Sequence, residues 1–204
     1  MKKIPIPGYG IYAVIDRCAC GSMPLVQIAE DCLSSGIKII QLRDKTEDIA
    51  GFYKNALLIR RLVKDKALFI INDRVDIARL IKADGVHLGQ SDLPLEAARK
   101  IMGPAGIIGK SCHSLKQAIQ AEKEGPDYIS IGPIFRTPTK PGYRPCGLEL
   151  LKKTCQQIKI PVVAIGGINT DNIKLVRNQG ARLIAVVRAI CKARDIGKAI
   201  VKLE

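Results

Sequence analysis

The segment GPIFRTPTK, from Gly132 to Lys140, concentrates side chains that bind anions. It carries Arg136, Lys140 and the hydroxyls of Thr137 and Thr139, and it directly follows the apolar run DYISI, which we predict to be a buried strand. A lysine charge and hydroxyl donors are the groups that hold phosphate through charge-assisted hydrogen bonds. The alternative is a solvated surface loop, since loops are often polar without binding anything. Other predicted strands end in loops of similar composition, which favours a phosphate site.

A second set of candidates follows the apolar run 37–43, in the sequence QLRDK. Gln41, Arg43 and Lys45 occupy every second position there. A period of two in extended chain places side chains on one face. Two cations and an amide converging on one face are suited to a diphosphate.

Two aspartates end the next two strand segments. Asp73 follows the third predicted strand directly after Asn72, and Asp92 closes GQSD after the fourth. Mg²⁺ is commonly held by one or two carboxylates together with phosphate oxygens of a substrate. Taken singly, each aspartate is also a candidate helix cap, because Asp73 precedes the predicted helix 75–81 and Asp92 precedes Pro94. The pair beside the cationic face favours a magnesium site.

Further polar residues follow the fifth strand, in KSCHS. Ser111 is a candidate ligand contact or a turn residue, and His113 is a candidate acid–base group or a structural histidine. Ser114 is the expected N-cap of the helix 115–124. His87, within VHLG, is expected to be a packed residue at a strand end rather than a catalyst.

The last two strand ends suggest another anion site. Gly166 and Gly167 follow the seventh strand, and Val187-Arg188 follows the eighth. Backbone N–H groups after strands seven and eight, with a helix start, form the usual phosphate site of a barrel, and glycine permits close approach of the backbone. The sequence thus predicts separate diphosphate and monophosphate sites, which fits a transferase that joins two phosphorylated substrates.

Eight apolar runs alternate with segments of helical period along the whole chain. The predicted strands are 9–15, 37–43, 67–71, 84–88, 107–111, 127–131, 161–167 and 181–187. Strands that are apolar almost throughout indicate a parallel sheet buried on both faces. Eight such units in one domain, residues 1–204, predict an α/β fold of the single (β/α)8 TIM barrel type. An open doubly wound sheet is the competitor, but its glycine turn after the first strand is missing from 16–21.

Composition limits the possible partners. The net charge of +14 is compatible with nucleic acid, an anionic membrane surface or small phosphorylated ligands. The cations are scattered, and aromatic residues make up only 4%, so stacking on bases is poorly supported. The seven cysteines show no metal-like grouping, and no segment has the length of a membrane span or the apolar core of a signal peptide. We expect a cytoplasmic protein acting on small molecules, with no nucleic-acid or membrane partner, and leave a homo-oligomer possible.

The motifs together resemble one family. QLRDK, IINDRVDIA, ADGVHLGQSDLP, IGKSCHS, DYISIGPIFRTPTK, IPVVAIGGI and AVVRAI, in this order and spacing, are similar to those of thiamine phosphate synthase over nearly the whole chain. The resemblance implies a (β/α)8 barrel that condenses hydroxymethylpyrimidine diphosphate with a thiazole monophosphate, or its carboxylated form. It also implies a dissociative mechanism, in which pyrophosphate leaves first, a pyrimidine carbocation forms, and the thiazole nitrogen attacks this cation.

The resemblance also implies roles for individual residues. It assigns Mg²⁺ to Asp73 and Asp92, and the thiazole phosphate to Gly167 with the backbone of Val187 and Arg188. It assigns catalytic contacts to Arg43, Lys45, Ser111 and Lys140. The residues implied to bind the pyrimidine diphosphate or to cover the reacting centre are Gln41, Leu42, Arg43, Asp44, Lys45, Asn72, Ser111, Thr137, Pro138, Thr139 and Lys140.

Two departures and two rival functions follow from the comparison with this family. Asp44 stands where the family usually has Glu, and Arg188 stands where it usually has Ser, so Arg188 either adds a contact to the acceptor phosphate or crowds it. A thiazole tautomerase, with a similar barrel, would need an acid–base group such as His113 but no metal pair. A non-catalytic phosphate-ligand or nucleic-acid binding protein would instead use the net charge of +14.

Overall fold

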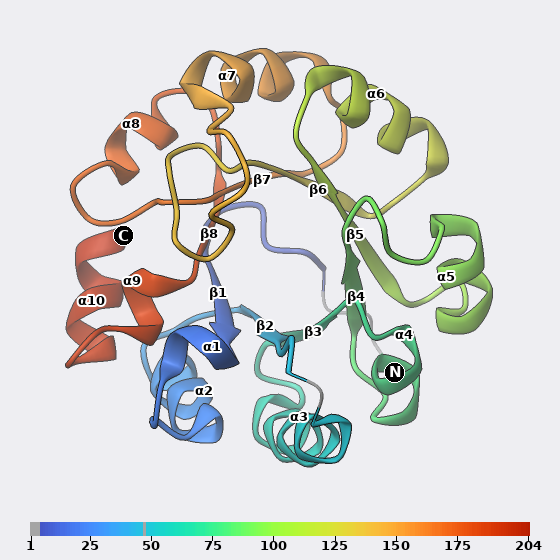
Figure 1. Ribbon diagram of the computed structural model, residues 1–204, viewed down its shortest axis with the longest axis vertical. Coiled ribbons are helices and arrows are strands. Elements are labelled where there is room, and N and C mark those ends of the chain that lie inside the picture. The colour runs from blue at the N-terminus through green and yellow to red at the C-terminus, as the bar shows by residue number, and fades with distance from the viewer. Residues whose placement is uncertain (1–4, 47) are drawn as a thin grey trace.

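A computed structural model describes residues 5–46 and 48–204 of the chain. The first four residues and Glu47 lie outside the described residues. Eight parallel strands pair in chain order and close into a barrel, β8 pairing with β1. This confirms the predicted (β/α)8 barrel, which Figure 1 shows with its helices surrounding the strands. The strands are β1 (Gly10–Asp16), β2 (Ile39–Arg43), β3 (Leu68–Asn72), β4 (Gly85–Leu88), β5 (Ile107–Cys112), β6 (Tyr128–Ile131), β7 (Val162–Ile165) and β8 (Leu183–Val186).

Helices follow the strands at nearly the predicted positions. They are α2 (Leu25–Ser34), α3 (Ile49–Val63), α4 (Val75–Leu80), α5 (Leu95–Met102), α6 (Leu115–Glu124), α7 (Gly147–Gln157), α8 (Ile173–Arg177) and α10 (Ile196–Leu203). Two one-turn helices that we did not predict, α1 (Arg17–Cys20) and α9 (Arg188–Cys191), follow β1 and β8 directly. The predicted cap of α6 is confirmed, because the Ser114 side chain accepts a hydrogen bond from the Gln117 N–H.

The strands separate two hydrophobic layers. Alternate residues point into the barrel, where Tyr12, Ile39, Ile70 and Tyr128 pack together with exposed fractions of 1% or less. The intervening residues, such as Ile40 and Leu42, pack outward against the helices. Because both faces are buried, the strands are apolar almost throughout, as expected for a parallel barrel.

Two aspartates at the N-terminal side of the barrel connect neighbouring units in the same way. Asp84 precedes β4, accepts from the Phe69 N–H at 2.8 Å and pairs with Arg60. Asp127 precedes β6, accepts from the Ile108 N–H at 2.8 Å and pairs with Arg99. Contacts on this side of a barrel serve stability, which leaves the opposite rim for chemistry.

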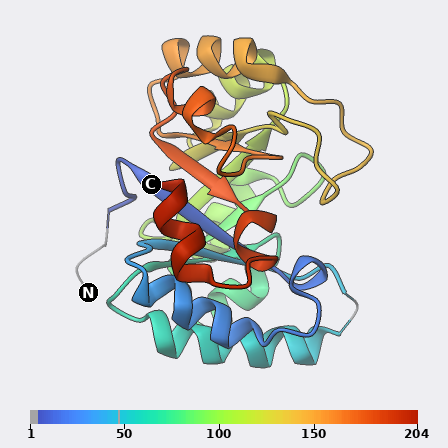
Figure 2. The same cartoon turned by 90° about the vertical axis from the view of Figure 1, so that its left-hand side faces the viewer.

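The loops at the carboxyl ends of the strands lie at one end of the barrel. Figure 2 shows α1 and the long loop between β6 and α7 at this same end. In Figure 1 the long loop curls over the barrel opening. Among the described residues, no helix is both long enough and apolar enough to cross a membrane.

Candidate active site

A cavity of about 260 Å³ opens at the carboxyl ends of the strands, and every strand contributes to its lining. A second hollow opens near Asp73, Asp92 and Lys45. The main cavity receives many of the residues that the sequence singled out. They are Gln41, Arg43, Asn72, Ser111, Thr137, Pro138, Thr139, Lys140, Gly167, Val187 and Arg188.

One side of the rim carries several cations. The Arg43 guanidinium donates to the carboxylate of Asp16, which also accepts from the Ala19 N–H and thereby starts α1. Lys45 lies just beyond the end of β2 and contacts Asp73, whereas Gln41 points into the barrel. Burial lowers the pKa of Lys140, and the charge of Arg43 lowers it further. Cations that repel one another in a half-buried site create a strongly positive potential for an anion.

Asp73 and Asp92 come together at the rim, as their positions on neighbouring strand ends predicted. Burial raises the pKa of Asp73, and its side-chain contact with Asp92 raises it further. The helix-cap alternative is wrong for both, because the N-cap residues of α4 and α5 are Arg74 and Pro94, and neither helix has a side-chain cap. Instead Asp92 accepts from the Gly89 N–H at 2.6 Å and closes its own loop.

The backbone at Asp73 is held in an uncommon conformation. Its φ angle is +61°, in the left-handed region that non-glycine residues rarely adopt. Asp73 N–H donates to the His87 carbonyl at 2.9 Å, which fixes the chain there. Residues held in such conformations cluster at functional sites, because surrounding structure must compensate for the strain.

Lys110, which the sequence analysis did not single out, supports the loop of Asp92. Its side chain is buried, and its ammonium donates to the Gly89 carbonyl at 2.8 Å. Gly89 is therefore held from both sides, by Lys110 through its carbonyl and by Asp92 through its N–H. A lysine inside a predicted strand is the signal that could have identified this residue.

Asn72 carries an unused donor. Its side-chain nitrogen is buried without a hydrogen-bond partner among the described residues, and the residue lines the main cavity. A buried donor without a partner costs about 1–3 kcal/mol, so such groups usually have a ligand or water to bind. Asn72 therefore offers a hydrogen bond to a molecule in this cavity.

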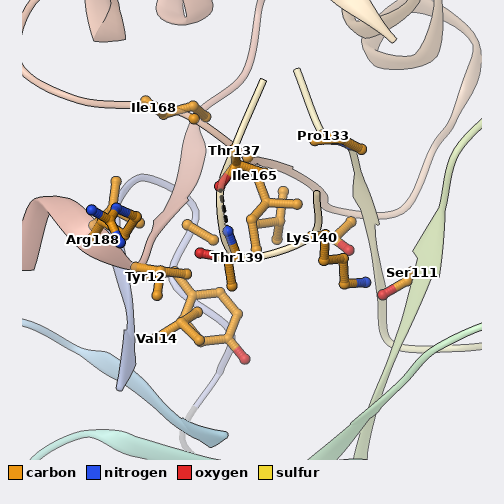
Figure 3. Close-up of a pocket in the computed structure, with 18 of the residues that line it drawn as sticks. Tyr12, Val14, Ser111, Pro133, Thr137, Thr139, Lys140, Ile165, Ile168 and Arg188 are labelled. Atoms are coloured by element: carbon orange, nitrogen blue, oxygen red, sulfur yellow. Dashed lines mark hydrogen bonds between the residues drawn. The ribbon is translucent and has the colours of Figure 1, made fainter. Parts of the chain in front are cut away.

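The opposite side of the cavity is formed by the ends of β7 and β8. Figure 3 shows Arg188 across the cavity from Ser111 and Lys140, which point toward each other. Gly167 has a φ of +67°, and a Cβ there would stand 2.6 Å from the Arg136 carbonyl oxygen. Glycine is thus required at 167 by the return of the 132–140 loop, independently of any phosphate.

The 132–140 loop is attached to β7 at its beginning. Ile134 N–H donates to the Ile165 carbonyl at 2.9 Å, and Phe135 N–H donates to the Gly166 carbonyl at 3.0 Å. Beyond Arg136 the Thr139 N–H donates to the Thr137 hydroxyl at 3.3 Å, drawn as a dashed line in Figure 3. The loop thus has a fixed base and a tip that stands over the cavity.

Four further residues singled out in the sequence have these places, Leu42 and Asp44 lying outside the main cavity. Leu42 packs in the outer core, so only its backbone is near the rim. Asp44 accepts from the N–H and hydroxyl of Thr46 and forms a turn beside the second hollow. His87 is packed at a strand end, as expected, but it also lines the cavity. His113 Nδ1 donates to the Gly132 carbonyl at 2.5 Å and its ring packs on Tyr143.

Gly109 gives space to the polar residues inside the barrel. A Cβ at this position would stand 2.2 Å from Tyr128 Cζ and 2.4 Å from His87 Nδ1. Gly109→Ala is therefore expected to lower the free energy of unfolding by about 1–3 kcal/mol, the usual cost of overpacking a core. Urea unfolding measures this loss. Gly142→Ala is the control, because a Cβ there meets nothing within 4 Å, and equal stability of both variants would contradict the packing argument.

Comparison with known proteins places this site in a family. The family model described as thiamine monophosphate synthase matches residues 11–190. The chain belongs to this family. A thiamine-phosphate synthase of Coprothermobacter proteolyticus is 45% identical over 187 residues, which are 91% of this chain and 89% of that protein. One from Ruminiclostridium cellulolyticum is 42% identical over 196 residues, covering 96% of this chain and 93% of the relative.

A solved structure extends this family assignment to three dimensions. Thiamine phosphate pyrophosphorylase from Pyrococcus furiosus has a TM-score of 0.87 and 40% identity, over 96% of this chain and 93% of that one. The resemblance stated from the motifs is thereby confirmed. More distant barrels, such as a KDPGal structure with a TM-score of 0.74 at 15% identity, share the fold alone.

Proposed function

We propose that this protein is a thiamine phosphate synthase. It would transfer the pyrimidinylmethyl group of hydroxymethylpyrimidine diphosphate to the nitrogen of a thiazole phosphate or its carboxylated form. The bond between the pyrimidine methylene and the diphosphate oxygen breaks, its electron pair leaves with pyrophosphate, and the thiazole nitrogen lone pair forms the new C–N bond. The observation that carries the proposal is the cation-lined rim beside the paired carboxylates Asp73 and Asp92, in a chain of this family.

The donor diphosphate is assigned to the cationic side of the cavity. Arg43 and Lys140 line it, and Ser111 offers a hydroxyl. The Asn72 side-chain nitrogen is a hydrogen-bond donor without a partner among the described residues. These groups bind the negative charge that grows on the leaving diphosphate, and such preorganised electrostatic stabilisation is usually the largest contribution to catalysis. The Arg43–Asp16 ion pair holds the guanidinium in place before substrate arrives.

The acceptor phosphate is assigned to the opposite side. Arg188 is exposed and lines the cavity there, with Val187 and Gly167. Because Arg188 stands at the cavity wall with its charge accessible, we favour the interpretation that it adds a contact to the phosphate over the interpretation that it crowds the site. Holding the two substrates on opposite walls brings the nitrogen and the methylene carbon together, which removes much of the entropy cost of the reaction.

The residues present fit a magnesium ion. Asp73 and Asp92 supply two carboxylates. Burial raises the pKa of Asp73 and the neighbouring Asp92 raises it further, and a bound cation would favour the ionised form of both. Two carboxylates with substrate phosphate oxygens are a common Mg²⁺ ligand set. When bound, the ion would neutralise part of the diphosphate charge during departure. Lys110, through the Gly89 carbonyl, keeps Asp92 in position for this role.

The tautomerase alternative has less support from the site. It needs an acid–base group but no diphosphate, whereas Arg43, Lys45, Lys140 and the carboxylate pair occupy the diphosphate side. His113 Nδ1 is engaged by the Gly132 carbonyl, which ties this nitrogen to the base of the 132–140 loop.

The test is pyrophosphate release from hydroxymethylpyrimidine diphosphate and thiazole phosphate. We expect release only with both substrates and Mg²⁺, and loss of release in EDTA. Release with the pyrimidine substrate alone would indicate a hydrolase instead. If neither combination releases pyrophosphate while thiazole phosphate still binds, the tautomerase becomes the better proposal.

A further inference from the structure

A chain of buried hydrogen bonds crosses the barrel interior from β2 to β5. Gln41 Nε2 donates to the Tyr12 hydroxyl at 2.7 Å, and Tyr12 and Tyr128 hydroxyls lie 2.9 Å apart. The Tyr128 hydroxyl lies 3.0 Å from His87 Nδ1, and His87 Nε2 lies 2.9 Å from the Ser111 hydroxyl. All five residues are buried, and all but Tyr128 line the cavity. The predicted site residues Gln41 and Ser111 are thus the two ends of one network.

The donor at one end fixes every proton along this chain. Within the part of the chain that the structure describes, the Tyr12 hydroxyl has two partners, the Gln41 amide nitrogen and the Tyr128 hydroxyl. The amide nitrogen can only donate, so the Tyr128 oxygen is the acceptor left for the single Tyr12 proton. Tyr128 then directs its own proton to His87 Nδ1, which must accept it. A neutral imidazole that accepts at Nδ1 carries its proton on Nε2. His87 therefore donates to Ser111.

The histidine is neutral, as this order requires. Burial lowers the pKa of His87 to about 3, and the charge of Lys140 contributes in the same direction. The two tyrosines are also neutral donors, since burial raises the pKa of each hydroxyl. Each member of the chain then has one defined role as donor or acceptor, and a fully satisfied buried network holds its groups in one arrangement.

This order of protons makes the Ser111 hydroxyl a donor toward the cavity. Since its oxygen already accepts from His87, its own proton is free to point into the cavity that it lines. In the reverse order Ser111 would give its only proton to His87 and would have none for an anion. The Ser130 hydroxyl oxygen lies 3.3 Å from the same His87 nitrogen. In this order of protons Ser130 is a second acceptor for the Nε2 proton, and His87 remains the donor to Ser111.

We propose that Tyr128 and His87 are positioning residues that orient the Ser111 hydroxyl as a donor to the diphosphate. Neither needs to touch the substrate phosphates or exchange a proton during turnover. The proton order can be measured without substrate, whereas the effect on the diphosphate rests on the function proposed above.

The first test reads the His87 tautomer directly. The chain contains only two histidines, so ¹⁵N-histidine labelling gives two ring spectra, and His113→Gln identifies which belongs to His87. We expect His87 in the folded protein to carry its proton on Nε2. A proton on Nδ1 would overturn the proposal, because Ser111 would then be a donor to the ring. In Tyr128→Phe we expect the single tautomer to give way to a mixture.

The second test is a double-mutant cycle on pyrophosphate binding, measured by calorimetry with inorganic pyrophosphate and Mg²⁺. Tyr128→Phe is expected to weaken binding about tenfold, the loss that removing the orienting partner of a metal ligand typically causes. Ser111→Ala is expected to weaken binding at least as much. If the network acts through Ser111, adding Tyr128→Phe to Ser111→Ala changes little. Tyr53→Phe, on the exposed face of α3, is the matched control.

The outcomes separate the two proposals. If the losses of Tyr128→Phe and Ser111→Ala multiply in the double variant, Tyr128 acts on the fold and the positioning role is wrong. If the parent protein binds no pyrophosphate, the proposed function fails at its donor site, while the His87 spectrum still decides the proton order.

Discussion

Asp73→Asn and Asp92→Asn are each expected to lower kcat by at least about a hundredfold while the barrel stays folded. Each variant keeps the side-chain shape but removes one of the two charges available to Mg²⁺. Loss of an ion that stabilises transition-state charge costs several kcal/mol, and each factor of ten corresponds to about 1.4 kcal/mol. Steady-state pyrophosphate release at saturating substrates measures the loss. Parent-like turnover in both variants would remove the carboxylate pair from the mechanism.

Asparagine is the right replacement at position 73 because of the backbone. Asp73 has a φ of +61°, and asparagine tolerates this region whereas alanine would add strain. Asp65→Asn is the matched control, because Asp65 is exposed in the turn after α3 and has a φ of +62°. It should leave kcat unchanged, since this turn leads into the N-terminal side of β3.

Asp73→Asn is expected to lower kcat without lowering the free energy of unfolding. Burial and the contact with Asp92 raise the pKa of Asp73 above its ordinary 3.8, so ionising it costs more in the folded than in the unfolded chain. That cost is absent at low pH and appears as the pH rises through the carboxyl range. In EDTA, Asp73→Asn should therefore be at least as resistant to urea as the parent at pH 7, with the difference vanishing near pH 3. A variant that is less stable at pH 7 would show that the carboxylate serves the fold.

Lys140→Met is the second substitution with a large expected effect. It keeps much of the side-chain length but removes a half-buried charge that lines the cavity, and we expect kcat to fall about a hundred- to a thousandfold, the usual cost of losing one donor to a developing charge. The pyrophosphate affinity should fall with it. Lys152→Met, on the exposed side of α7, is the control. If pyrophosphate binds the Lys140 variant as tightly as the parent, Lys140 faces another part of the substrate.

The pH dependence should identify the same lysine. Burial and the charge of Arg43 lower the pKa of Lys140 below the ordinary 10.5, so its charge is lost at a lower pH than that of an exposed lysine. In the parent, kcat/KM reports the free enzyme. As the pH is raised, this value should begin to decrease before pH 10.5 is reached. A bound diphosphate stabilises the ammonium and moves the fall in kcat to higher pH. Lys140→Met should lack this difference between the two profiles.

The sequence alone determined the barrel and most of its rim. Eight apolar runs with almost no alternation, each followed by a segment of helical period, indicated strands buried on both faces. The carboxyl end of each run is where a barrel places its chemistry. Asp73 and Asp92 could be predicted to meet because neighbouring parallel strands place their ends side by side. Spacing also predicted that Gln41, Arg43 and Lys45 share a face. Gln41 and Arg43 lie within β2 and line the main cavity, whereas Lys45 lies beyond the end of the strand and lines the second hollow instead.

The tertiary structure decided which residues far apart in the chain contact each other. Asp16 holds Arg43 across 27 positions, and Tyr12 meets Tyr128 across 116. Tyr12, His87 and Tyr128 each stood in an apolar run, where a single polar residue does not reveal its partner. Asp73 and Asp92 contact each other instead of capping helices. This contact depends on the left-handed backbone at Asp73 and on Lys110, which holds the loop at Gly89. A linear pattern specifies which face a side chain takes, but only barrel closure sets which other strand supplies its hydrogen bond.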